Sequence, residues 1–238
     1  MNGSLLRLCA RVLRAPAELV DRDGRVPLAQ LLPALLALIA IGGGLFGLVI
    51  GSYRGGVQHL FAAIKLPLVL LLPLLVSLPA CRALYLAAGV RVSYERLVFA
   101  SLVGMARAAL LMAAAGPALW LVYSVALDYH VAVMLMCLAL AVAGGIGLVT
   151  TASLLPGGGH LRFCAHAASL AIVGIVLAQG GWLLRPFLVR PRADVAFVRP
   201  LEADVFSSMN AALDSSRGRY KGWQAKEVPL WEKDEVTR

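Results

Sequence analysis

The chain has 238 residues, of which 60% are hydrophobic and 15% are charged, and its mean hydropathy is +0.81. Soluble domains are roughly 45–50% apolar and about 25% charged, so this composition excludes a single soluble core and also a disordered, collagen-like or disulfide-stapled chain. Ten of the 35 charged side chains lie between Gln30 and Leu188. We therefore predict an all-α polytopic membrane helix bundle between a short polar segment and a longer polar tail.

The net charge of +9 does not predict binding to nucleic acid. The basic residues stand mostly beside apolar segments, where they orient membrane spans and meet anionic lipid headgroups. The four cysteines have no C-x-x-C spacing, which favours buried thiols over a disulfide framework. We expect membrane lipids as partners, no nucleic acid and no cofactor.

Five apolar segments are long enough to cross the membrane, since a span needs about 20 residues. They cover residues 31–52, 66–88, 108–127, 131–155 and 163–184. These spans predict three regions: an N-terminal segment at 1–29, a five-span domain at 30–188, and a polar tail at 189–238.

The distribution of basic residues predicts the orientation of the chain. With five spans, the N-terminus shares a side with the second and fourth connections, and that side carries ten arginines near span ends against six basic residues opposite. Basic residues accumulate on the cytoplasmic side. We expect a bacterial inner membrane protein with a cytoplasmic N-terminus and a periplasmic C-terminus.

The N-terminal segment has an amphipathic pattern. Its apolar side chains (Leu5, Leu6, Leu8, Cys9, Val12 and Leu13) can share one broad side, while Arg7, Arg11 and Arg14 recur on another. This pattern is typical of a helix that lies on the membrane surface. A solvated stub that only sets the orientation is the alternative interpretation.

The first connection, GSYRGGVQHLFAAIKLP, carries Arg54 and Lys65 near its two ends. It is too short and too polar to cross the membrane alone. We expect a separate helix here, either lying on the surface or partly re-entrant.

Small residues at four-residue spacing predict close helix packing, because they let helix backbones approach one another in lipid. The predicted helix-packing residues are Gly43, Gly47, Gly51 and Gly55 on the first span, and Ala143 and Gly147 on the fourth, followed by Thr151. Packing within the chain is the simpler interpretation, with packing between chains as the alternative.

No predicted span carries Asp, Glu, Lys or Arg near its centre, which disfavours a charge-coupled transporter. The histidines His59, His130, His160 and His166 stand near span ends, and the spacing of the last two does not place both on one helix face. The chain also has no Ser-His-Asp set, nucleophile elbow or phosphate loop. We predict no catalytic, cofactor-binding or metal-binding residue.

The tail after the last span contains Arg-Pro three times, which predicts an extended chain there. A short amphipathic helix is expected around residues 205–213, followed by a polar stretch. That stretch carries apolar anchors of the kind found at interface centres, and we expect it to bind a partner protein through Tyr220, Trp223, Leu230 and Trp231. Contact of these side chains with lipid is the alternative.

The sequences GLVIGSYRGGVQHLFAAIKLPLVLLLPLLVSLP and WLLRPFLVRPRADVAFVRPLEADVFSSM together resemble a family of uncharacterised bacterial five-span membrane proteins. The shared features are a glycine-rich first span, an A-x-K-x-P start to the second, and a terminal LRPF followed by an aromatic-x-R-P. The span number is also similar to that of the Yip family of membrane-trafficking proteins. The resemblance implies a fold and a topology, and it implies no catalytic residue.

Three functions are compatible with these features. The leading hypothesis is a non-catalytic scaffold or accessory subunit of a larger, hetero-oligomeric membrane complex. The second is a Yip-like role in membrane shaping or lipid handling. The third is a transporter or membrane enzyme that uses the His, Cys and Arg residues at the span ends.

Overall fold

The computed structural model describes residues 2–20, 27–125, 129–156, 160–188 and 197. Its contacts divide the chain into two units, Met1–Pro200 and Leu201–Arg238, and the second lies outside the described residues. The described chain of the first unit is helical. In order, its elements are α1 (Asn2–Arg14), the 3-10 helix η1 (Pro16–Leu19), α2 (Leu28–Ser52), α3 (Gln58–Ala87), α4 (Tyr94–Tyr123), α5 (Tyr129–Leu154) and α6 (His160–Leu183).

Helices α2 to α6 are long and apolar enough to cross a membrane. Helix α2 has 25 residues, and α3 and α4 have 30 each. At about 1.5 Å per residue they are longer than the ~30 Å hydrocarbon core, so their ends reach the headgroups. The prediction of an all-α multi-pass membrane bundle with five spans is confirmed.

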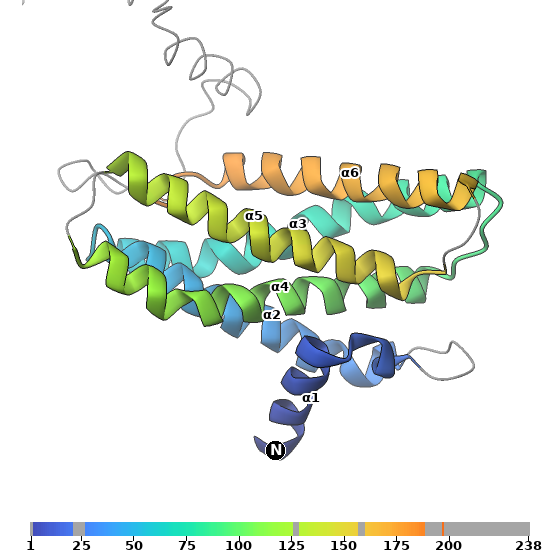
Figure 1. Ribbon diagram of the computed structural model, residues 1–238, viewed down its shortest axis with the longest axis horizontal. Coiled ribbons are helices and arrows are strands. Elements are labelled where there is room, and N and C mark those ends of the chain that lie inside the picture. The colour runs from blue at the N-terminus through green and yellow to red at the C-terminus, as the bar shows by residue number, and fades with distance from the viewer. Residues whose placement is uncertain (1, 21–26, 126–128, 157–159, 189–196, 198–238) are drawn as a thin grey trace, which may run out of the picture. The chain divides into compact units, whose positions relative to one another are not determined.

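The five long helices run alongside one another, and α1 lies at an angle to them (Figure 1). Helix α2 packs against both α3 and α4, while α5 packs on α4 and α6 packs on α3. Helices α5 and α6 barely touch each other. In the apolar stretch of α4, 67% of the residues are buried, whereas the corresponding shares are 22% in α5 and 17% in α6. The bundle therefore has an inner set, α2 to α4, and two outer helices.

Helix α4 begins 14 residues before the predicted third span. Ser93 is its N-cap, with extended backbone angles and a side chain that accepts a hydrogen bond from the backbone N–H of Arg96 at 3.2 Å. This bond satisfies one of the free N–H groups at a helix start. The helix then continues through Arg96 and Arg107. The prediction that no span has a charged residue near its centre is therefore wrong for α4.

Helix α3 also differs from the expected pattern. The predicted separate helix in the first connection does not exist, because α3 begins at Gln58 and includes Lys65. Gly55 and Gly56 have φ values of +80° and +61°, which residues other than glycine rarely adopt. These two glycines form the tight turn between α2 and α3. That turn leaves room for only a few residues, so α3 starts at once.

Glycines bring the inner helices into backbone contact. A Cβ atom on Gly47 would clash with the backbone of Ala62 in α3, and one on Gly51 would lie 2.7 Å from the carbonyl oxygen of Gln58. A Cβ on Gly43 would meet Pro67 at 3.2 Å. Three of the four glycines that we predicted to pack helices on the first span thus face α3. Gly55 lies in the turn instead, with nothing within 4 Å of its Cβ position.

The contact between α4 and α5 follows the same principle. A Cβ on Gly147 would lie 2.7 Å from the carbonyl oxygen of Gly104, and a Cβ on Gly104 would clash with Gly147 and Thr151. Ala143, one turn away on α5, is also buried. On the α4 side, the sequence pattern did not single out Gly104.

Helix α1 is docked on the bundle through a narrower face than predicted. Leu8 and Val12 are buried, at 6% and 0% exposure, and α1 contacts α4. Leu6 points outward, with 70% exposure. Because one face of α1 is buried, the segment is not a solvated stub. Contact of α1 with lipid stays a prediction.

Substituting Gly47 by alanine should destabilise the bundle by about 1–3 kcal/mol, since overpacking a tight contact forces a backbone shift. Thermal unfolding of the detergent-purified protein measures this effect. Gly145→Ala is the matched control, because a Cβ there meets nothing within 4 Å. Equal melting temperatures for the two variants would contradict the close α2–α3 contact.

Candidate functional site

Lys65 lies in the first half of α3 and is fully buried, with 0% exposure. Its Nζ donates a hydrogen bond to the carbonyl oxygen of Pro186 at 2.9 Å. Side chains on a helix lean toward its N-terminus, so a lysine two turns into α3 reaches back toward the end of the bundle where α6 stops. The lysine therefore joins α3 to the chain that leaves α6.

Two aromatic rings also lie close to this amino group. The Nζ atom lies 4.9 Å from the ring centroid of Phe197 and 5.8 Å from that of Phe187. Phe61 on α3 packs edge-on against Phe197, with ring centroids 5.1 Å apart. Both distances to Lys65 fall within the range of cation–π attraction. The rings and the carbonyl together replace the water that the lysine has lost.

Gln58, at the start of α3, holds the same segment. This side chain is 0% exposed, and its Nε2 donates to the carbonyl oxygens of Phe187 at 2.6 Å and Pro186 at 3.3 Å. Among the described residues, no donor reaches its Oε1. We refer to Gln58, Phe61, Lys65, Pro186, Phe187 and Phe197 as the Lys65 cluster.

The chain after α6 turns onto α3 at this cluster. Arg185 and Pro186 are joined by a cis peptide bond, and the Arg185 guanidinium lies 3.8 Å from the ring centroid of Trp182. Leu188 is buried at 4% exposure. Phe187 and Phe197 lie against side chains of α3.

Arginines on α4 make a second set of interhelical contacts, to the end of α5. Arg96 donates from Nε and Nη2 to the carbonyl oxygen of Leu154, at 3.2 and 3.1 Å. Arg107 donates from Nη1 to the hydroxyl of Thr150 at 2.9 Å. Helix C-termini expose carbonyl groups and partial negative charge, which basic side chains satisfy. Both arginines therefore fasten α5 to α4.

The histidines do not gather into a site with the other candidate residues of the described chain. His166 packs edge-on against Tyr85 at 5.2 Å between centroids, and His59 contacts the carbonyl oxygen of Gly56 at 3.1 Å within its own turn. Within the described ranges, no group of three or more His, Cys, Asp and Glu residues could hold a metal ion. The predicted partner-binding residues Tyr220, Trp223, Leu230 and Trp231 lie outside the described residues.

Sequence reasoning did not identify Lys65 or Gln58 as site residues. Lys65 stood at the edge of a predicted span, where a lysine simply reaches the headgroups. The available signal was the set of three motifs, A-x-K-x-P, LRPF and aromatic-x-R-P, which supplies Lys65, Pro186 with Phe187, and Phe197. The structure brings these three motifs into one contact.

Comparison with known proteins adds no homologue: no family model matches the chain, and neither a curated protein nor a solved structure is similar to it. The resemblance to a bacterial five-span family stays a prediction.

The geometry of the Lys65 cluster favours a structural role for this lysine over a chemical one. A lysine acting as a base or nucleophile needs access to its substrate, whereas Lys65 is fully buried and bonded to a backbone carbonyl. What this arrangement can do is hold the chain after α6 in a fixed place on α3.

Because Lys65 and Gln58 bond the same carbonyl, their substitutions should not be additive. A double-mutant cycle with Lys65→Met and Gln58→Leu should give a coupling energy of about 0.5–3 kcal/mol, measured by thermal or denaturant unfolding in detergent.

The matched control pairs Lys65→Met with Ser77→Ala. Ser77 lies three turns further along α3 and donates to the carbonyl oxygen of Pro73 in its own helix, at 2.8 Å. These two substitutions should be additive. Additivity in both cycles would show that Lys65 and Gln58 do not share a partner.

Proposed function

We propose that the protein is a non-catalytic scaffold or accessory subunit of a larger bacterial membrane complex. The observation that carries this proposal is the Lys65 cluster, which fixes the point at which the chain leaves the bundle. A segment that orders on binding is more effective when its attachment point is rigid, because less freedom is lost. The proposed partner-binding residues follow this attachment point in the sequence.

The use of the charged groups supports the same proposal. Lys65, Arg96 and Arg107 each bond a group on a neighbouring helix or on the chain that follows one. Ionisable residues inside a membrane protein often mark a transport path or a reaction centre. Here the three are occupied in packing the bundle, which favours a structural protein.

The outer helices offer surfaces for a partner's membrane spans. Ala141 and Gly145 stand four residues apart on the outward side of α5. A Cβ at Gly145, or at Gly181 of α6, would meet nothing within 4 Å. Small outward residues at this spacing let a second helix approach closely in lipid. These positions favour association with other membrane subunits.

We further propose a cytoplasmic N-terminus and a periplasmic C-terminus in the bacterial inner membrane, on the basis of the arginine distribution. Alkaline phosphatase fused within residues 53–57 or 124–128 should be active, and fusions within 88–93 or 155–159 should be inactive. The reverse pattern would overturn the orientation.

The partner-binding proposal is tested by replacing Trp223 and Trp231 with alanine together. Buried tryptophans at interface centres contribute about 2 kcal/mol or more each. The double variant should insert normally but lose partners that copurify with the wild-type chain in mild detergent, as identified by mass spectrometry.

Trp120→Ala is the matched control, since Trp120 is a 52% exposed residue of the span α4. It removes an outward tryptophan without touching the tail, and the copurifying proteins should be unchanged. If the double tail variant also retains every partner, the tail does not carry the interface.

A further inference from the structure

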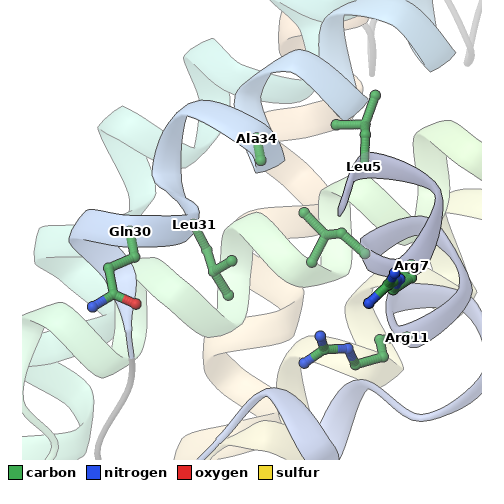
Figure 2. A pocket seen from close by; sticks show the side chains of 7 residues that line it. Leu5, Arg7, Arg11, Gln30, Leu31 and Ala34 are labelled. Carbon is green, nitrogen blue, oxygen red and sulfur yellow. The ribbon is translucent and has the colours of Figure 1, made fainter. Parts of the chain in front are cut away.

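A groove lies between α1 and the start of α2, on the outside of the bundle (Figure 2). Its volume is about 330 Å³, within the range of small-molecule sites. Seven residues line it: Leu5, Arg7, Leu8 and Arg11 from α1, and Gln30, Leu31 and Ala34 from α2.

The lining has an apolar part and a basic part. Leu5 and Leu8 from α1 and Leu31 and Ala34 from α2 supply its apolar side chains, and Leu8 is 6% exposed. Arg7 and Arg11 lie one turn apart on α1, both exposed, across from the side chains of α2 (Figure 2). An occupant of this groove needs an apolar portion and a negatively charged one.

The charge of the groove is not balanced by nearby carboxylates in the described chain. Glu18 and Glu95 are the two carboxylates of the described residues, and neither lines the groove. Two guanidinium groups one turn apart can bind one phosphate together, because each offers a planar fork of donors. The groove is therefore complementary to an anion.

The position of the groove identifies the source of that anion. Leu31 and Ala34 lie in the first two turns of α2, a helix that crosses the membrane. The groove is thus near the level at which acyl chains meet the headgroups, where amphipathic helices with basic polar faces bind anionic lipid.

We propose that this groove binds one anionic phospholipid. Its phosphate lies between Arg7 and Arg11, and the first part of an acyl chain covers Leu31 and Ala34. This site is independent of the partner proposal, since it involves no residue of the tail.

Native mass spectrometry of the full-length protein in mild detergent tests the proposal, with phosphatidylglycerol and phosphatidylcholine as probes. The wild-type chain should retain one phosphatidylglycerol, bound at least about tenfold more tightly than phosphatidylcholine. Arg7→Gln with Arg11→Gln should remove that preference. Ala34→Phe should weaken binding of both lipids by filling the apolar floor.

Arg14→Gln is the matched control, because Arg14 is on the same helix and does not line the groove. It should keep the full preference, and melting temperatures confirm that each variant is folded. Equal binding of the two lipids, or an equal loss in the control, would overturn the proposal. Displacement of the lipid by inorganic phosphate would overturn it too, since the groove would then be a site for a free anion.

Discussion

A basic side chain buried in an apolar helix must find its polar partner inside the protein, and one end of this bundle depends on how Lys65 does so. Its amino group bonds the Pro186 carbonyl and lies over the rings of Phe187 and Phe197. A bilayer supplies no such partner to a group of this kind. Satisfying this one lysine allows α3 to continue as a single helix, and it requires the chain after α6 to return to α3.

Polar side chains of the inner helices also hold the chain at the C-terminal ends of both outer helices. Helices α5 and α6 are the least buried, and each packs mainly on one inner helix. Arg96 and Arg107 of α4 bond the last turn of α5, and Lys65 and Gln58 of α3 bond the chain just after α6. Arg96 thus satisfies a carbonyl group that the C-terminus of α5 leaves free, and Arg107 bonds a threonine hydroxyl. Lys65 and Gln58 bond carbonyl groups of the chain beyond α6. Glycine contacts join α2 to α3 and α4 to α5, and basic side chains add polar contacts between the inner and the outer helices.

Much of the fold was predictable, because apolar length alone identifies a span and small residues at four-residue spacing identify a close contact. What sequence could not show was where polar groups find partners. Arg107 stood just before the predicted third span, yet it lies inside α4, where Thr150 accepts its hydrogen bond. Lys65 stood at the edge of the predicted second span, and its partner lies 121 residues later in the chain. Such long-range pairs leave no periodic trace in the sequence.

Solid-state NMR of the full-length chain in lipid bilayers tests the central claim most directly. With ¹⁵N at lysine Nζ and ¹³C at proline carbonyls, the bond from Lys65 to Pro186 should give a dipolar coupling for a distance of about 4 Å, given the length of such hydrogen bonds. This coupling should vanish in Lys65→Met and persist in Ser77→Ala. A wild-type chain without it, or a Lys65→Met variant that retains it, would contradict the account.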